Sequence, residues 1–314
     1  AAGCPVVIKP AELTPLTALM LGALVHEAGA PPGVCNVVTG TGGQAGAALV
    51  AHPGVDHITF TGSVATGQAV MRAAASGVTR LILELGGKSP MVVMCDADLE
   101  SAVHSAIGAI YEHAGQICSA GSRLVIARSI HDAFVDRFCQ EARALKLSRG
   151  LRDAGMGPLV SRQQQQRVQG FVERARQAGI PVRCGGRVAT DPVDGDGWFF
   201  EPTVLGPAPR DAECVQEEIF GPVLTVQVFD DVDEAIALAN GTRFALAAGV
   251  FTRDFGQAHL LARALDAGQV YINEYFAGGI EVPFGGNRQS GFGREKGWQA
   301  VQAYCKLKAV AARI

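Results

Sequence analysis

The chain has 314 residues, of which 48% are hydrophobic and 18% charged, with a formal net charge of −3. This composition supports a large core in one domain or two and argues against a disordered chain. It shows no basic stripe with interleaved aromatic residues and no apolar run of membrane-spanning length, so we expect no nucleic-acid partner and no membrane partner. Eight cysteines without a CxxC pair are typical of reduced, cytoplasmic thiols, and seven histidines without ligand spacing predict no metal site.

The first part of the chain alternates strand and helix signals. Strands are expected at residues 6–8, 36–38, 58–60 and 81–85. Helices are expected from the Thr14-Pro15 start to Gly29, and at 45–51 and 66–75. Strands separated by helices of this length imply parallel pairing with right-handed crossovers. The fold class is therefore α/β, with a doubly wound parallel sheet whose ligand site lies at the carboxyl ends of its strands.

Gly86-Gly87 is the expected hinge into a second α/β domain. Its strands are expected at 91–95, 124–127, 223–229, 249–251 and 270–272. Its helices are expected at 99–113, 130–145, 162–178, 232–239 and 255–265. Residues 191–197 are a predicted polar surface loop between strands. Residues 303–310 are a predicted terminal strand, whose open edge we expect a partner subunit to cover.

Cys118 stands where an apolar helical pattern gives way to small and polar residues. The other seven cysteines lie in varied contexts with no shared spacing. A lone cysteine is more often a small buried hydrophobe than a nucleophile. This segment alone therefore leaves both interpretations open.

Glu84 lies in the apolar run 81–85. A carboxylate in an apolar strand is costly unless it is paired, protonated or used. Taken alone, it is most simply a structural glutamate satisfied by a buried Lys or Arg. A cysteine nucleophile and a desolvated glutamate base together describe covalent catalysis on a carbonyl, followed by attack of water.

Two glycine-rich turns compete for a dinucleotide pyrophosphate. The segment from Gly40 to Ala45 formally satisfies the pattern GxGxxA between a strand and a helix, and on pattern alone it is preferred. The acidic residue expected about twenty positions further on is missing there. The second turn, from Gly62 to Gly67, also joins strand to helix but does not fit the pattern. Both clusters are equally compatible with ordinary turns.

Several short segments together carry a resemblance to a known family. LELGGKSP at 83–90 and GQIC at 115–118 closely resemble the two signature motifs of the NAD(P)-dependent aldehyde dehydrogenase superfamily. Further segments match in the right order at 8–15, 60–63, 217–222, 283–286 and 290–295. Each motif is moderately specific alone, and the ordered set is very specific. The resemblance spans essentially the whole chain.

The resemblance implies a division of the chain into three parts. Residues 1–86 would be the C-terminal part of a Rossmann-like NAD-binding domain, 87–288 the catalytic domain, and 289–314 a return segment with an oligomerisation strand. It also implies a missing upstream part, which holds an oligomerisation hairpin and the Pro-Trp-Asn-Phe-Pro motif with the side-chain oxyanion donor. We therefore expect a homo-oligomer, a dimer or tetramer, in the full-length context. The chain alone is expected to be nearly inactive as a dehydrogenase.

The resemblance also implies a cofactor site, and it reverses the choice of turn. Gly62 and Ser63 match the pyrophosphate turn, where helix N-terminal amides meet the phosphates. Gly42 and Gly46 would approach the adenine side, Lys9 the adenosine ribose, and Glu12 its hydroxyls. A carboxylate there repels a 2′-phosphate, so NAD is favoured over NADP. Glu218 and Phe220 would hold the nicotinamide ribose and ring. The remaining cofactor residues are Phe60, Gly67 and Leu85.

The implied reaction is oxidation of an aldehyde to a carboxylic acid. Cys118 adds to the aldehyde, hydride passes to the nicotinamide, and Glu84 activates the water that releases the product. A catalytically silent subunit and an esterase-like enzyme without redox chemistry are the alternatives, and only a dehydrogenase must bind NAD. The aldehyde itself is not readable from the sequence, because residues 275–281, expected to bear selectivity, are loops.

Overall fold

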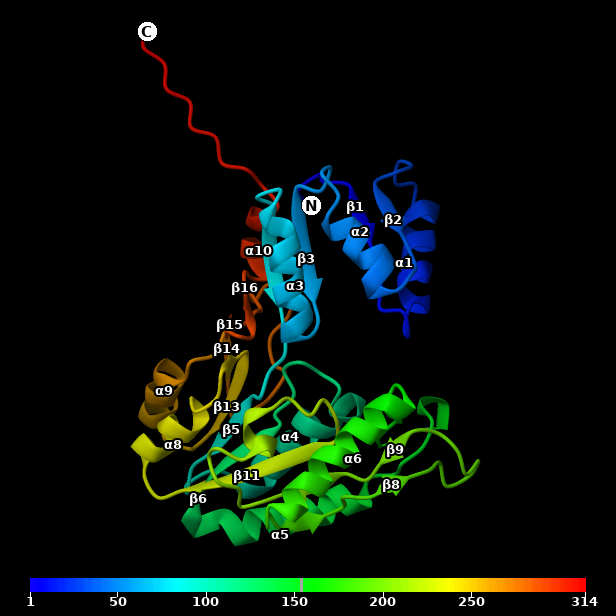
Figure 1. Cartoon of the computed structure of the whole chain (residues 1–314). Coiled ribbons are helices and arrows are strands. Elements are labelled where there is room, and N and C mark those ends of the chain that lie inside the picture. Colours follow the sequence, from blue (N-terminus) through cyan, green and yellow to red (C-terminus); the bar gives the residue numbers. More distant parts are fainter. Residues whose placement is uncertain (153–154) are drawn as a thin grey trace. The chain divides into compact units, whose positions relative to one another are not determined.

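The computed structural model describes residues 1–152 and 155–314, which divide into two compact units (Figure 1). Unit 1 comprises residues 1–84, 279–284 and 291–314, and unit 2 comprises 85–278 and 285–290. The chain first passes from unit 1 to unit 2 between Glu84 and Leu85, close to the predicted Gly86-Gly87 hinge. Residues 279–284 belong to unit 1, whereas the sequence places them in the second domain.

Unit 1 contains two β-α-β units. β1 (Val6–Ile8) and β2 (Cys35–Val37) are parallel, with α1 (Leu16–Glu27) between them in the chain. β3 (His57–Thr61) and β4 (Arg80–Glu84) are also parallel, with α3 (Val64–Ala75) between them. The parallel α/β pairing is therefore confirmed. The strands form two sheets, because β1-β2 and β16-β4-β3 share no ladder among the described residues.

Shorter elements complete unit 1. A π-helical turn (Gly42–Gly46) and α2 (Ala47–Val50) follow β2, and β16 (Gly291–Phe292) pairs antiparallel with β4. The chain ends after α10 (Gly297–Ala303). The predicted strand at 303–310 is wrong, since the described residues after α10 form no strand and 305–314 are exposed. A strand needs the backbone groups of a neighbour, and the described part of the chain places none beside this segment.

Unit 2 is built on a seven-stranded sheet of order β14-β13-β5-β6-β11-β10-β7. All neighbours are parallel except the edge strand β7, which is antiparallel to β10. The strands are β5 (Pro90–Val93), β6 (Arg123–Ala127), β7 (Val182–Cys184), β10 (Thr203–Leu205), β11 (Val223–Phe229), β13 (Ala247–Phe251) and β14 (Gln269–Ile272). Two small antiparallel pairs lie outside it, β8 (Val188–Ala189) with β9 (Phe199–Phe200) and β12 (Phe244–Ala245) with β15 (Asn287–Arg288).

Helices cover both faces of this sheet. They are α4 (Leu99–Tyr111), α5 (His131–Ala144), α6 (Arg162–Gln177), α7 (Glu213–Gln216), α8 (Val232–Ala239) and α9 (Phe255–Ala264), and the short 3₁₀ turns are η2 (Glu112–Gly115), η3 (Arg128–Ile130) and η4 (Gly150–Arg152). Met91 and Val93 join the core cluster under α4, α5 and α6, whereas Val92 and Met94 join the cluster under α8 and α9. Alternate residues thus serve opposite cores, which explains the continuous apolar runs that predict these strands.

Two further properties bear on function. Within the described residues no helix combines the length and apolar character needed to cross a membrane. The same residues contain no group of three or more His, Cys, Asp or Glu side chains placed to hold a metal ion.

Candidate active site

Cys118 follows a turn with an unusual backbone. α4 ends at Tyr111, and His113, Ala114 and Gly115 then have φ angles of 49°, 57° and 71°. Such angles are uncommon for residues with a Cβ and require support from the surroundings. Ala114 is buried, and a Cβ on Gly115 would come 2.2 Å from the carbonyl oxygen of Gly221. The chain is therefore held tightly just before Cys118, which is half-buried.

The glycine pair 86–87 brings two predicted site residues together within unit 2. A Cβ on Gly86 would lie 2.3 Å from Glu218 Oε2, and a Cβ on Gly87 would lie 2.4 Å from the Cys118 carbonyl oxygen. The Gly87 N–H donates a hydrogen bond of 3.1 Å to Glu218 Oε1. These glycines are needed for space, because any side chain would displace Cys118 or Glu218.

Glu218 and Phe220 are held by α6. Gln164 Nε2 donates to the carbonyl oxygens of Ile219 (3.2 Å) and Phe220 (2.7 Å), and Arg167 Nη2 donates to that of Glu218 (2.8 Å). Phe220 has φ = 57° and an exposed side chain. Burial raises the pKa of the Glu218 carboxyl, and the Gly87 N–H and the charge of Lys88 oppose that rise.

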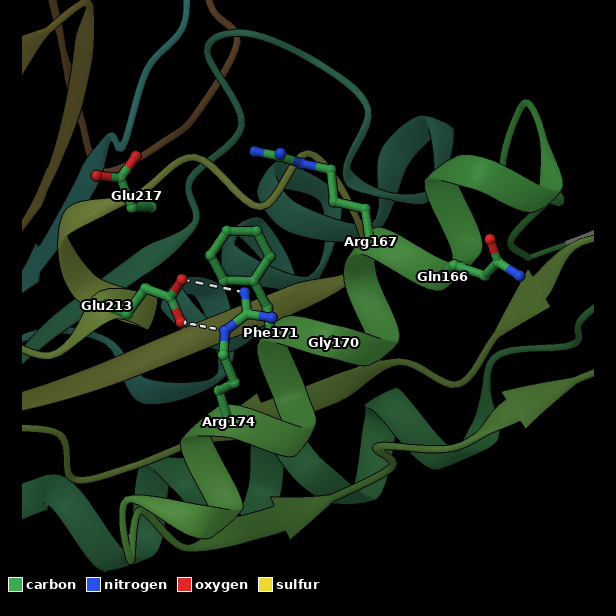
Figure 2. Close-up of a pocket in the computed structure, with 7 residues that line it drawn as sticks. All are labelled: Gln166, Arg167, Gly170, Phe171, Arg174, Glu213 and Glu217. Carbon is green, nitrogen blue, oxygen red and sulfur yellow. Dashed lines mark hydrogen bonds and ion pairs between the residues drawn. The ribbon is translucent and has the colours of Figure 1, made fainter.

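A hollow of about 540 Å³ opens beside this segment (Figure 2). Arg167 and Arg174 lie over the Phe171 ring, with their guanidinium carbons 5.1 and 4.8 Å from its centre. Arg174 forms a two-pronged ion pair with Glu213 (Figure 2). Glu217 at the rim is held by Arg243 through two contacts of 2.6 Å. Sequence analysis predicted a helix at 162–178 but missed the contacts that its Gln164 and Arg167 make with residues 218–220.

An aromatic cluster lies beside Cys118. The Tyr275 ring contacts the Tyr271 ring at a tilt and the Phe276 ring edge to face, each with a centre-to-centre distance of 4.9 Å. Tyr275 Oη donates a 2.9 Å hydrogen bond to the Ser119 carbonyl oxygen. Burial and the neighbouring Cys118 raise the pKa of Tyr271 to about 12. These rings can form an apolar wall for a substrate held at the thiol. Sequence analysis pointed to residues 275–281 but missed Tyr271, which belongs to a strand.

Glu84 ends β4 in unit 1. Its backbone is fixed, because it pairs with Gly291 and its carbonyl accepts the Gly62 N–H at 3.0 Å. Its side chain is 2% exposed, and neither carboxyl oxygen has a hydrogen-bond partner among the described residues. Burial raises the pKa of Glu84 to about 8, with Glu295 adding to the rise and Arg294 opposing it. A carboxyl with a pKa near neutrality is suited to take a proton from water.

The predicted cofactor residues of unit 1 form two groups. In the first, which contains Lys9, Glu12, Gly42 and Gly46, Lys9 Nζ donates to the Gly40 carbonyl at 3.1 Å and lies 3.7 Å from Glu12 Oε2. Gly46 lies against the Lys9 side chain, since a Cβ there would be 3.5 Å from Lys9 Cδ. The first glycine-rich turn is thus in contact with Lys9.

The second group contains Phe60, Gly62, Ser63 and Gly67. Ser63 caps α3, and its Oγ accepts the Thr66 N–H at 3.2 Å. The Phe60 ring covers Gly62, where a Cβ would lie 2.5 Å from Phe60 Cζ, and Gly67 is buried in α3. A glycine turn at the start of a twelve-residue helix is the kind of feature that can bind the phosphates of a dinucleotide. Leu85, the remaining predicted residue, is buried in unit 2.

A family model described as "Aldehyde dehydrogenase family" matches residues 1–310. The betaine aldehyde dehydrogenase of Bacillus subtilis is 43% identical over 311 residues, which are 99% of this chain and 64% of that protein. The 4-trimethylaminobutyraldehyde dehydrogenase of Homo sapiens is 43% identical over 317 residues, 100% of this chain and 64% of that protein.

Solved structures agree with this assignment. An aldehyde dehydrogenase from Bacillus cereus has a TM-score of 0.95 at 44% identity, over 98% of this chain and 62% of that one. A betaine aldehyde dehydrogenase from Staphylococcus aureus in complex with NAD⁺ has a TM-score of 0.94 at 40% identity, over 96% of this chain and 62% of that one. The chain therefore belongs to the aldehyde dehydrogenase family, which confirms the resemblance and the fold class. It spans less than two thirds of the length of these relatives.

Proposed function

We propose that the protein to which this chain belongs oxidises an aldehyde to a carboxylic acid with NAD. The observation that supports this most directly is the close approach of Gly86-Gly87 to both Cys118 and Glu218. It explains why the signature segment needs two glycines, and it supports a site in which the backbone of Cys118 lies close to a carboxylate suited to a ribose. The relatives named above point to the same reaction class.

In the proposed mechanism the Cys118 thiolate attacks the aldehyde carbon and forms a thiohemiacetal. The Cys118 backbone N–H stabilises the oxyanion. Bound NAD supplies the hydride acceptor. The resulting thioester on Cys118 is hydrolysed by a water molecule from which Glu84 takes the proton. A pKa of about 8 lets Glu84 exchange that proton near neutral pH. The Tyr271, Tyr275 and Phe276 rings exclude bulk water from the thiol side.

Cofactor contacts are proposed for the residues predicted from the sequence. Lys9, Glu12, Gly42 and Gly46 would serve the adenosine end, and Glu12, with its half-exposed carboxylate, favours NAD over NADP. Gly62 and Ser63 would hold the pyrophosphate, and Glu218 and Phe220 the nicotinamide riboside. Phe60, Gly67 and Leu85 would shape the groove. A cytoplasmic homo-oligomer remains a proposal. Neither the described site nor the named relatives support the catalytically silent alternative.

The test is a chimera that joins this chain to the upstream part of the Bacillus subtilis relative. We expect it to form NADH with aldehydes, among them those for which the relatives are named. Cys118→Ser should abolish NADH formation. Glu84→Gln should leave a first burst of NADH while steady turnover collapses, because the base serves hydrolysis. NADH formation that survives Cys118→Ser would contradict the proposal, as would loss of burst and turnover together in Glu84→Gln.

A chimera that does not fold leaves the question open to a second measurement. The chain itself should hydrolyse an activated ester through Cys118, since acylation needs only the thiol and its oxyanion site. We expect an acylated Cys118 in the Glu84→Gln variant, identified by peptide mass. Acylation at other cysteines with Cys118 unmodified would overturn the assignment.

A further inference from the structure

Glu217 and Arg243 form an ion pair beside the segment that carries Glu218 and Phe220. Arg243 Nη1 donates to Glu217 Oε1, and Arg243 Nη2 donates to Glu217 Oε2, each at 2.6 Å. Two parallel contacts between a guanidinium and a carboxylate fix the orientation of both groups as well as their distance. Figure 2 shows Glu217 at the rim of the hollow, apart from the other ion pair drawn there. Sequence analysis assigned neither residue to the site.

Arg243 is a fixed support, because contacts hold its side chain and the strand that follows it. Its guanidinium carbon lies 4.9 Å from the centre of the Phe244 ring. Its carbonyl oxygen accepts the Gln289 N–H at 3.1 Å. β12, which begins at Phe244, pairs with β15, and the Ala245 N–H donates to Ser290 Oγ at 3.0 Å. The ion pair therefore connects Glu217 to a strand that is itself held in place.

The same support reaches the glycine pair that contacts Glu218. Ser290 Oγ donates to the Gly86 carbonyl oxygen at 2.8 Å. Gly86 leaves room for the Glu218 carboxylate, and the Gly87 N–H donates to it. These residues all belong to unit 2, and their contacts form a ring around Glu218. Glu218 is thus held through its carboxylate by the glycine pair and through its preceding residue by Arg243.

The segment from Glu218 to Phe220 needs this support, because it lies outside the helices and strands. Phe220 has φ = 57°, a conformation that is costly for an aromatic residue and persists only where the surroundings impose it. On one side, α6 holds the carbonyl oxygens of the segment through Gln164 and Arg167. Arg243 restrains the segment at its other end, where it leaves α7.

We propose that Arg243 is a positioning residue for the nicotinamide riboside of NAD, and that it acts through Glu217 on residues 218–220. The inference rests on the proposed function, in which Glu218 and Phe220 hold the riboside. Without the ion pair these two side chains would sample other positions, and NAD would have to order them when it binds. The side chains of Arg243 and Glu217 are 41% and 36% exposed, so the pair adds little to stability, and its effect falls on the order of the segment.

Steady-state kinetics of the chimera described above test this inference. Arg243→Gln should raise the KM for NAD about fivefold, the ratio that corresponds to the loss of one partly exposed ion pair. The kcat at saturating NAD should change little, because the lost order affects binding. The reversed pair, Arg243→Glu with Glu217→Arg, should recover most of the affinity. Arg128→Gln breaks another two-pronged, exposed pair of unit 2, with Asp230, and as the matched control should leave the KM for NAD unchanged.

Hydrogen exchange of the chain itself gives a second measurement, which needs no cofactor. The Gly87 amide donates to Glu218, so its exchange rate reports whether the carboxylate stays in place. The amide should exchange faster in Arg243→Gln than in Arg128→Gln, and the reversed pair should slow it again. The two single variants should unfold at similar temperatures, so that a general loss of stability cannot explain the difference.

The outcomes separate this inference from the proposed function. An unchanged KM for NAD in Arg243→Gln would overturn the inference and leave the proposed function intact, whereas a folded chimera that forms no NADH would overturn both. A KM raised equally in Arg128→Gln, or a Gly87 amide that exchanges equally in the two variants, would also overturn the inference. Where Arg243→Gln does not fold, Glu217→Gln removes the same pair from the other side and must give the same rise.

Discussion

Replacing Glu84 by glutamine should stabilise the protein in a way that depends on pH. The Glu84 carboxyl is 2% exposed and has no hydrogen-bond partner among the described residues. Its pKa rises from 4.5 to about 8 on folding. Between these values the native state keeps a proton that the unfolded state has released. The stability of the unaltered protein therefore falls as pH rises from 4.5 to about 8.

The size of the effect follows from the same interval. At about 1.4 kcal/mol for each pH unit, the range from 4.5 to about 8 sets an upper limit of roughly 5 kcal/mol. Solvent screening and relaxation around the charge reduce this, and we expect about 2 kcal/mol. The amide is neutral at every pH and does not meet this penalty. The advantage of Glu84→Gln should be near zero at pH 4.5, grow to about pH 8, and stay constant above it.

Thermal unfolding at a series of pH values measures this. We expect the unfolding temperature of Glu84→Gln to exceed that of the unaltered chain by about 4–8 °C at pH 9. Glu27→Gln, which removes an exposed glutamate of the same unit, is the matched control and should change little at any pH. A difference that is the same at all pH values, or an unaltered chain that is the more stable at pH 9, would refute a buried and uncompensated Glu84.

Three further substitutions or reactions test the site. Gly87→Ala should destabilise the protein by about 1–3 kcal/mol in denaturant unfolding, because the new Cβ would meet the Cys118 carbonyl. The control Gly108→Ala, in open space on α4, should stabilise the protein by about 0.5–1 kcal/mol. Equal effects of the two substitutions would refute the clash. Lys88→Met should stabilise the protein by about 1–3 kcal/mol at pH 7, because burial lowers the pKa of Lys88 from 10.5 to about 8. This gain in stability should disappear as the pH rises from about 8 to 10.5. A gain that persists at pH 11 would have another cause. Iodoacetamide at neutral pH should label Cys118 before Cys35 or Cys184, as read by peptide mass; the reverse order would count against a nucleophilic Cys118.

The strands of unit 2 could be predicted because their signal is local. Residues 223–229 were expected as one strand, and β11 spans Val223–Phe229. Such central strands are buried on both faces, so most positions are apolar and the run stands out. The segment 303–310 was also predicted as a strand, yet it forms none. Its extended structure depends on a hydrogen-bonding neighbour, which no local pattern can supply.

The candidate site shows the same limit. The motifs pointed to Cys118, Glu84 and Glu218 because each stands in a short, specific segment. The aromatic Tyr271 and the clamp by Gln164 and Arg167 were missed, because their places depend on tertiary packing of β14 and α6. Left-handed backbone at His113 and Ala114 is equally hidden, since neither residue type signals it.

The segment between Glu84 and Lys88 shows how stability and function diverge in this chain. Glu84 closes unit 1 and Lys88 lies in unit 2, and both are buried ionisable groups whose side-chain polar atoms lack hydrogen-bond partners in the described structure. Burial drives the pKa of each toward 8, one upward and one downward. The protein would be more stable with an apolar residue at either position. Two such groups stand within five consecutive residues of the sequence, on either side of Leu85 and the two glycines that make room for Cys118 and Glu218. Buried ionisable groups that recur in one short segment indicate selection for function rather than for stability.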